Sequence, residues 1–187
     1  IRLQATGKSE LKNFTKLEIL NQPVFFHGDA FFAGFYLNEI LLRLCPLEEM
    51  MPQTFEQYQL ILVLLQQLAT HEQAAVFLRQ ILRQFEHVLL VELGYAIDFS
   101  TDASQQDIQV NQHYQFQLND GFLPVSQASR STLDGRLITS MQSYEDGQDF
   151  SHEQLQLLGK LYRQMISALL GDRPLKSRQL WIQSTQT

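Results

Sequence analysis

Hydrophobic positions recur with helical spacing over most of this chain. The first such pattern begins near Asp29, a residue type that caps helix N-termini, and ends at Cys45-Pro46, where proline cannot continue a helix. Its apolar positions are Phe31, Phe32, Phe35, Ile40, Leu41 and Leu44. Because residues three and four apart share one face of a helix, the pattern predicts a helix with one buried side.

Two further helical patterns follow. Pro52, which suits the first turn of a helix, opens the second, and the third runs from about His71 to Leu93 with Gly94 just past its end. The apolar positions are Phe55, Tyr58, Ile61, Leu62, Leu65 and Leu68 in the second helix, and Phe77, Ile81, Phe85, Val88, Leu89 and Leu93 in the third. The third is the longest element, so we expect it at the centre of the domain.

Two segments have the pattern of β-structure. Residues 3–19 alternate apolar and polar around a Gly-Lys-Ser turn, which is typical of the end of a β-meander. After a polar loop at 98–112, the stretches HYQFQL and GFLPV flank Asn119-Asp120-Gly121. Because Gly121 tolerates a positive φ, this arrangement predicts a small hairpin near 113–125.

The C-terminal part returns to helical patterns. A short helix is expected around 131–143, and Ser151 with Gln154 forms a capping box before LQLLGKLYRQMISALL, which we take as the last helix. No linker divides the chain after its first strands. The expected fold is therefore mainly α: a helical domain over residues 23–187 with a small β-hairpin inserted near 113–125.

Composition favours one large core in a reducing compartment. The chain has 187 residues, 44% of them hydrophobic, and a chain of this length buries roughly 70% of its unfolded surface. Cys45 is the single cysteine, which excludes an internal disulfide and a C-x2-C zinc set, and the cytoplasm fits this usage. No apolar run reaches the roughly 18 residues that span a membrane, and no secretory apolar region opens the chain. We expect neither membrane spanning nor export.

Motifs for catalysis or cofactor binding are absent. Gly7-Lys8-Ser9 lacks the upstream glycine of a phosphate-cradling loop, and a turn is the simpler interpretation. The five histidines are dispersed without metal-ligand spacing. Carboxylates are numerous, but no pair is set apart by spacing as a general acid and base. We therefore expect no enzyme, no cofactor and no metal.

Charge is distributed unevenly along the chain. Residues 1–20 hold four basic and two acidic side chains, residues 21–159 hold five and seventeen, and residues 160–187 hold five and one. The net charges are thus +2, -12 and +4, which together make the formal -6 of the whole chain. Because a local basic patch attracts a polyanion even on an acidic protein, the two ends remain candidates for nucleic-acid contact.

The segment GDRPLKSRQLW at 171–181 carries much of the C-terminal positive charge. Gly171 predicts the stop of the preceding helix, and Pro174 fixes φ and predicts an extended segment after it. We interpret the cations here and near the N-terminus as one phosphate-contacting surface for DNA. The predicted DNA-binding residues are Lys160, Arg163, Arg173, Lys176 and Arg178, with Lys8, Lys12 and Lys16 on the same side.

Two other interpretations of this segment stay open. The cations nearest the stop could complement the dipole of the last helix. Arg178 could instead be buried against an acidic partner such as Glu39 and so fix the tail to the helical core.

A second group of cations lies on the third predicted helix. Arg79, Arg83 and His87 are spaced i, i+4, i+8 and so form one stripe along it. One interpretation is a surface stripe paired with Glu72 or Glu86. The other is a cationic strip beside an apolar groove, which would suit an acidic peptide or a terminal carboxylate.

Three stretches together resemble a known family. YLNEILLRL at 36–44, LRQFEHVLLVELGYAIDF at 82–99 and PLKSRQL at 174–180 are similar, in this order, to motifs of the RecO family of bacterial recombination mediators. The resemblance implies an OB-fold followed by a helical domain. Residues 1–22 then correspond only to the last strands of the OB-fold, most of which lies outside this chain. Some members carry a four-cysteine zinc site after the L-G-Y helix, but this sequence has no cysteine there.

The resemblance also implies a function. Members of the RecO family bind single- and double-stranded DNA, anneal strands, engage single-stranded-DNA-binding protein, and with RecR help RecA displace it, in the bacterial cytoplasm at the nucleoid. The family takes the acidic C-terminal tail of single-stranded-DNA-binding protein in a groove of the helical domain, and its tail-binding arginine corresponds here to Arg83. A helical adaptor without DNA affinity and a small-molecule enzyme or binder are the alternatives.

Overall fold

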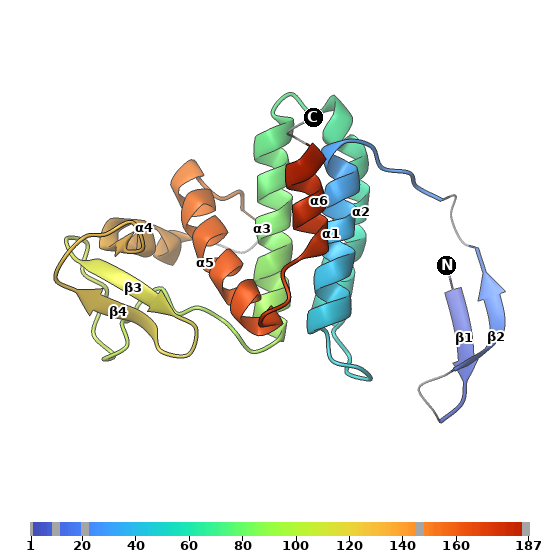
Figure 1. The fold of residues 1–187 in the computed structure, drawn as a ribbon, viewed down its shortest axis with the longest axis horizontal. Coiled ribbons are helices and arrows are strands. Elements are labelled where there is room, and N and C mark those ends of the chain that lie inside the picture. The colour runs from blue at the N-terminus through green and yellow to red at the C-terminus, as the bar shows by residue number, and fades with distance from the viewer. Residues whose placement is uncertain (1, 9–11, 20–22, 145–147, 185–187) are drawn as a thin grey trace.

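The computed structural model covers residues 1–187 and describes all of them except 1, 9–11, 20–22, 145–147 and 185–187 (Figure 1). Helices dominate the described residues, as the sequence predicts. They are α1 (Asp29–Leu44), α2 (Pro52–Gln67), α3 (Ala74–Glu92), α4 (Gly135–Thr139), α5 (His152–Leu170) and α6 (Lys176–Ser184), with short 3-10 turns at Leu68–Thr70 and Ser140–Ser143. The strands are β1 (Arg2–Thr6), β2 (Asn13–Glu18), β3 (His113–Gln117), β4 (Gly121–Val125) and β5 (Leu133–Asp134).

The long helices lie side by side, with α3 in the middle (Figure 1). Helix α3 packs against α2 on one side and α5 on the other, and α6 packs on α1. The apolar face of each helix supplies the core. Its fully buried side chains include Leu37, Ile40, Ile61, Leu65, Ile81, Phe85, Leu89 and Leu158. The prediction of a mainly α domain around the third helix is therefore confirmed.

The starts of α1 and α2 each have a feature that the sequence pattern did not indicate. Gly28, with φ 56°, is the N-cap of α1, so the prediction of Asp29 as N-cap is wrong by one residue. Pro52 does open α2, but two backbone N–H groups of its first turn, at Gln53 and Thr54, donate to the carboxylate of Glu92 at 3.2 and 2.7 Å. A side chain at the end of α3 thus caps α2, which local sequence cannot indicate.

Helix α3 is shorter at its start than predicted and ends as predicted. It begins at Ala74 rather than His71, because His71 lies in a turn where its Nδ1 accepts from Gln73 N at 3.1 Å. Gly94 follows the helix with φ 86°, a backbone conformation that favours glycine.

The small sheet contains the predicted hairpin and one strand more. Strands β3 and β4 pair antiparallel with Phe116 opposite Phe122, and β5 pairs with the other edge of β3. The helix predicted at 131–143 is therefore shorter, because residues 133–134 pair as β5 before α4 begins. Gly135 is required at this junction, since a Cβ there would lie 2.0 Å from the carbonyl oxygen of Gln109.

The start of α5 matches the predicted capping box. Ser151 Oγ accepts from Gln154 N at 3.2 Å, and Gln154 Oε1 accepts from Ser151 N at 2.8 Å. The preceding residue, Phe150, donates its N–H to Oε1 of buried Gln80 on α3 at 2.9 Å. Local capping and this tertiary bond together fix α5 against α3.

The polar loop between α3 and β3 is ordered by two aspartates. Asp98 accepts hydrogen bonds from Ser100 and Thr101, and Asp102 Oδ1 accepts from Ser104 N at 2.8 Å and Gln106 N at 3.0 Å. Among the described residues, no group of three or more His, Cys, Asp or Glu side chains is placed to hold a metal ion. Hydrogen bonds to these two carboxylates thus stabilise the turns of this loop.

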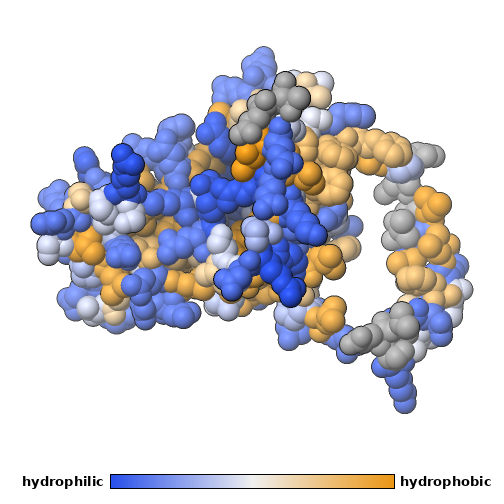
Figure 2. Space-filling model, in the orientation of Figure 1, coloured by the Kyte–Doolittle hydropathy of each residue, from blue (hydrophilic) through white to orange (hydrophobic). Residues whose placement is uncertain are grey.

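The N-terminal hairpin stands apart from the helical body (Figure 1). Strands β1 and β2 pair antiparallel, with Leu3 opposite Leu17, as the alternation predicts. Several apolar side chains of this segment are exposed, and they appear as orange atoms on the hairpin in Figure 2. They are Leu3, Phe14, Leu17 and Ile19. That this hairpin ends an OB-fold stays a prediction.

The C-terminal segment is the main correction to the predicted fold. Helix α5 is not the last helix, and the segment after Pro174 is not extended, because Lys176–Ser184 forms α6. The Glu39 carboxylate on α1 accepts from the backbone N–H groups of Lys176 and Ser177 at 2.9 and 2.8 Å. A distant acidic side chain thus caps α6 at the end where the helix dipole favours negative charge.

Further contacts fix α6 along α1. Arg43 Nη1 donates to the carbonyl oxygen of Pro174 at 3.3 Å. Trp181 Nε1 donates to Asp29 Oδ1 at 3.0 Å, and its ring stacks on Phe32 with centroids 6.1 Å apart. The tail is therefore fixed to the core through Glu39, but by backbone donors of Lys176 and Ser177. Arg178, which one interpretation buried against Glu39, is exposed and does not bond to it.

We expect Glu39→Gln to weaken the docking of α6. The charged acceptor of two N–H groups is lost, which costs about 1.5–3 kcal/mol. Burial raises the pKa of Glu39, but the hydrogen bonds from Ser177, Lys176 and Arg43 outweigh it, so its pKa lies below the ordinary value. This stabilisation is therefore fully present above the pKa of an unfolded glutamate, about 4.3, and is lost as the pH falls through the lower folded pKa.

The emission of Trp181, the single tryptophan of the chain, measures this effect in urea titrations at neutral and acidic pH. Glu56→Gln makes the same chemical change at an exposed position of α2 and serves as the control. Equal unfolding free energies for Glu39→Gln and the unchanged protein would show that the cap contributes nothing.

We expect the loop at 98–112 to depend on Asp102 and not on metal. Asp102→Ala leaves two backbone N–H groups without their acceptor, which costs about 1–3 kcal/mol, whereas Asp107→Ala at an exposed position should cost less. The free energies of unfolding in urea, measured with and without a chelator, test this. A loss of stability on adding the chelator would contradict the expectation.

Candidate functional site

Two adjoining hollows lie where α3 faces α5 and α6. The arginine pocket, about 160 Å³ in volume, is formed chiefly by Tyr36, Arg83, Glu86, Arg163, Arg178 and Trp181, with an apolar floor that includes Leu82 and Ile166. The basic groove continues from it along α3 and α5 and is formed chiefly by Arg79, Arg83, Gly159, Lys160 and Arg163. Arg83 and Arg163 line both hollows and so connect them.

A buried carboxyl group is part of the wall of the arginine pocket. Glu86 on α3 is 1% exposed. Its Oε1 accepts from the Tyr36 hydroxyl on α1 and from Arg83 Nη2 at 2.6 Å. Burial raises the pKa of Glu86, an effect that Arg83 and Tyr36 oppose, and burial also raises the pKa of Tyr36, which keeps its hydroxyl protonated as a donor. Glu86 thereby fixes the direction of Arg83.

Two more guanidinium groups lie at the rim of this pocket. Arg163 comes from α5 and Arg178 from α6, and both are exposed. Burial, and then the positive charges of Arg178 and Arg83, lower the pKa of Arg163, although an arginine remains charged in a protein. Three like charges gathered around one carboxylate leave a net positive site that suits an anion.

The predicted stripe on α3 is only partly in the groove. Arg79 and Arg83 line it, and Arg83 also forms the ion pair with Glu86 that the alternative interpretation proposed. His87 does not line either hollow; its Nδ1 lies 2.9 Å from the Tyr162 hydroxyl, and its ring lies edge-on to Tyr144. The spacing i, i+8 thus places His87 in the contact between α3 and α5.

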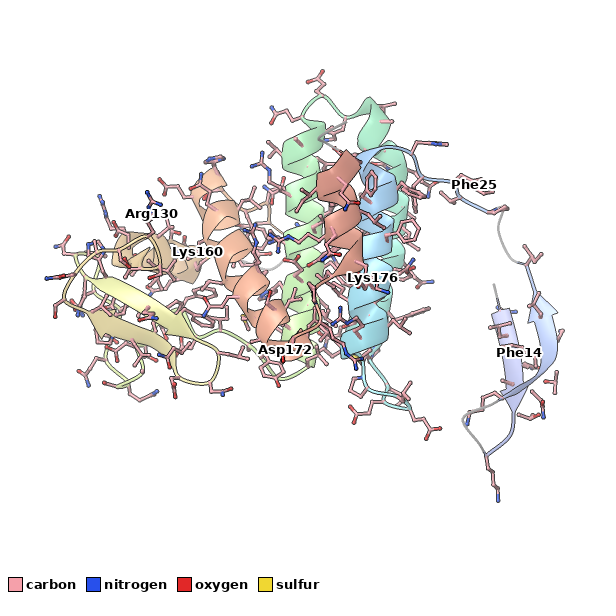
Figure 3. The ribbon with its side chains drawn as sticks, viewed as in Figure 1. Phe14, Phe25, Arg130, Lys160, Asp172 and Lys176 are labelled. Carbon is pink, nitrogen blue, oxygen red and sulfur yellow. The ribbon has the colours of Figure 1, made fainter. Side chains whose placement is uncertain are left out.

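The predicted DNA-binding cations separate into three places. Lys160, Arg163 and Arg178 line the same two hollows as Arg83. Lys160 Nζ also donates to the carbonyl oxygens of Arg130 and Thr132. Figure 3 shows Lys160 and Arg130 on the side of α5 away from Lys176. Arg173 and Lys176 line a separate groove between α1 and α6. Lys8, Lys12 and Lys16 lie on or beside the N-terminal hairpin, where Lys12 pairs with Glu48 at 3.4 Å and Lys16 with Glu18 at 2.7 Å.

Tyr36, Glu86 and Trp181 were not predicted as parts of a site. Tyr36 and Trp181 lie on α1 and α6, far apart in sequence, and no spacing rule connects them. Glu86 is three residues from Arg83, which indicated an ion pair but not its burial. The only available signal was the position of all three within or next to the motifs YLNE, RQFE and PLKSRQL.

Comparisons with known proteins identify the family. The family model described as "Recombination protein O C terminal" matches residues 26–179. A relative from Pseudoalteromonas translucida, named DNA repair protein RecO, is 36% identical over 179 residues, which is 95% of this chain and 73% of the relative. Proteins of the same name from Pseudomonas putida and Cellvibrio japonicus are 36% and 37% identical, over 97% and 94% of this chain and 75% and 71% of the relatives. The chain therefore belongs to the RecO family of bacterial DNA repair and recombination proteins and includes the C-terminal domain of that family.

Proposed function

We propose that this chain is a non-enzymatic recombination mediator that brings the acidic tail of single-stranded-DNA-binding protein and DNA together. In this proposal it binds single- and double-stranded DNA, anneals strands, and works with RecR to load RecA in the bacterial cytoplasm. Five cations from three helices lie along the basic groove and the arginine pocket, with Arg83 fixed by buried Glu86. This arrangement is the observation that carries the proposal. No described helix is long and apolar enough to cross a membrane.

The basic groove suits an acidic peptide in charge and in shape. Arg79, Arg83, Lys160 and Arg163 line it, and none of its lining residues is acidic. A Cβ at Gly159 would lie 3.5 Å from Arg83 Nη1, so glycine leaves this side of the guanidinium open to a ligand. A guanidinium that is already held in place binds a carboxylate with less loss of side-chain entropy.

DNA contact is assigned to the exposed cations outside the groove. Lys8 and Lys16 are exposed on the hairpin side, and Arg173 and Lys176 are exposed at the start of α6. Phosphate contacts need cations that can approach the backbone of a strand, and such contacts do not require a deep pocket.

One observation favours a helical adaptor without DNA affinity as the alternative. Lys12 and Lys16 already pair with Glu48 and Glu18, which reduces their availability to phosphates. Surface ion pairs are weak and are readily exchanged for stronger ones, so we favour DNA binding. Salt-dependent gel shifts distinguish the two functions.

We expect Arg83→Ala to weaken binding of the tail peptide by about 1.5–3 kcal/mol, because a charge-assisted hydrogen bond to a carboxylate is lost. Arg79→Ala should cost less, since Arg79 is exposed. Isothermal titration of the peptide into each variant measures both effects.

Controls separate binding from folding in this experiment. Arg83→Lys keeps a positive charge beside Glu86 but loses the forked geometry, so its affinity should lie between those of the unchanged protein and Arg83→Ala. Arg136→Ala removes an exposed arginine of α4, outside both hollows, and should bind normally. Unchanged affinity in a folded Arg83→Ala protein would remove this site from the proposal.

We expect Lys8→Ala and Lys16→Ala each to reduce the salt dependence of single-stranded DNA binding. Each lost phosphate contact lowers the slope of log K against log salt by roughly 0.7. The melting temperature should stay unchanged, because both side chains are exposed. If strands bind with the same slope in both variants, the hairpin lysines do not contact DNA; if no strand binds while the tail peptide does, the adaptor function is correct.

A further inference from the structure

The arginine pocket contains buried polar atoms that have no partner in the described part of the chain. Glu86 Oε2 accepts no hydrogen bond, and Arg83 Nε donates none. Glu86 lines the pocket and is 1% exposed, so its unpartnered oxygen is buried in the wall of the pocket. Leaving such groups unpaired costs folding free energy, which indicates that something else occupies the pocket in the working protein.

The charges of the pocket favour an anion. Arg83, Arg163 and Arg178 contribute three positive charges and ionised Glu86 one negative charge, which leaves +2. The three guanidinium groups are close enough for Arg178 and Arg83 to lower the pKa of Arg163, and a bound anion would relieve this repulsion. The volume of about 160 Å³ accommodates a small ion, since a water molecule takes about 30 Å³ in the liquid.

The ligand must also donate a hydrogen bond, because Glu86 Oε2 can only accept while ionised. A carboxylate has no donor. A phosphodiester likewise has no O–H group, and it continues as a chain in two directions. A phosphate monoester titrates between charges of about -1 and -2 close to neutral pH, and its monoprotonated form, with a single negative charge, has an O–H group beside its acceptor oxygens.

We infer that the arginine pocket binds a phosphate monoester group, with its oxygens on Arg83, Arg163 and Arg178 and its P–O–H donating to Glu86 Oε2. The group could come from free phosphate or from the terminal phosphate of a DNA strand, since the two share this chemistry. The inference goes beyond the proposed function, and free phosphate tests it whether or not DNA binds.

Trp181 gives a direct readout of binding, because it lines the pocket and is the single tryptophan of the chain. Its emission is titrated with sodium phosphate, and with sodium sulfate and sodium chloride at matched ionic strength. Sulfate has the charge and shape of phosphate but no proton to donate. We expect a saturable response to phosphate and at least a tenfold weaker one to sulfate, because sulfate faces the Glu86 oxygen without a hydrogen bond.

Variants from two helices locate the site. Arg163→Ala on α5 and Arg178→Ala on α6 should each weaken phosphate binding at least tenfold, whereas Arg136→Ala, which also removes an arginine, should not. Unfolding in urea verifies that each variant is folded. If phosphate behaves like chloride, or if both pocket variants keep the affinity of the unchanged protein, the inference is wrong.

Glu86→Gln tests the role of the carboxylate. Oε1 is the acceptor for Tyr36 and Arg83, so the amide oxygen should take that position and the amide NH2 group the position of Oε2. The pocket then offers a donor where it had an acceptor. We expect the preference for phosphate over sulfate to disappear in this variant. An unchanged preference would contradict the hydrogen bond to Glu86.

The source of the phosphate is decided with two oligonucleotides of one sequence, with and without a 5′-phosphate. A strand end as the ligand predicts about fivefold tighter binding of the phosphorylated strand, and loss of that preference in Arg178→Ala. Equal binding of the two strands together with a phosphate response supports the pocket and assigns it to free phosphate. If no strand binds, the proposed DNA binding fails, and the phosphate and sulfate titrations still decide the pocket.

Discussion

The buried carboxylate of Glu86 is the interaction on which the arrangement of the helices depends. A carboxyl group at 1% exposure needs hydrogen-bond partners, and positive charge around it favours its ionised form. The donors come from Tyr36 on α1 and Arg83 on α3, and the pocket above it is lined by Arg163 of α5 and Arg178 of α6. Side chains of four helices thus meet around one carboxylate, and a displacement of α1 or α3 would remove a hydrogen bond from it. The same requirement holds Arg83 ready for a ligand, so the stability of the bundle and the geometry of the site have a common cause.

Helix α6 participates in this arrangement only because a second carboxylate holds it. Glu39 accepts the first backbone N–H groups of α6, and Arg43, one turn later on α1, donates to the carbonyl oxygen of Pro174. A nine-residue helix is too short to be stable in water by itself, so α6 forms because it docks. The C-terminal segment is therefore a wall of the site. Its Arg178 and Trp181 are positioned by contacts with α1, which is adjacent in space but more than a hundred residues earlier in the sequence.

The sequence predicted the parts of the fold that local physics decides. The capping box at Ser151, the turn at Gly94 and the proline that opens α2 are short-range features, and the structure contains each of them. Apart from small shifts at the starts of α1 and α3, the parts that were wrong or missing depend on partners distant in sequence. Helix α6 is capped by Glu39, more than a hundred residues earlier, and β5 exists because β3 offers an edge. The same distinction between local and distant causes applies to the site. Arg79 and Arg83 were predicted from helical spacing, whereas Tyr36 and Trp181 have no local signal.

Charged residues that are neighbours in the sequence do not all lie on one surface of the folded chain. The cations after residue 160 were interpreted as one surface because they are neighbours along the chain, but Arg178 lies in the pocket with Arg83 while Lys176, two residues away, lines the groove on α1. On a helix, two residues apart means nearly opposite faces. The whole chain has a formal charge of -6, yet the pocket has three arginines against one carboxylate. At physiological salt, charges beyond about 8 Å are largely screened. An anion at the pocket therefore interacts mainly with the nearby guanidinium groups, because the surplus of carboxylates elsewhere is screened from it.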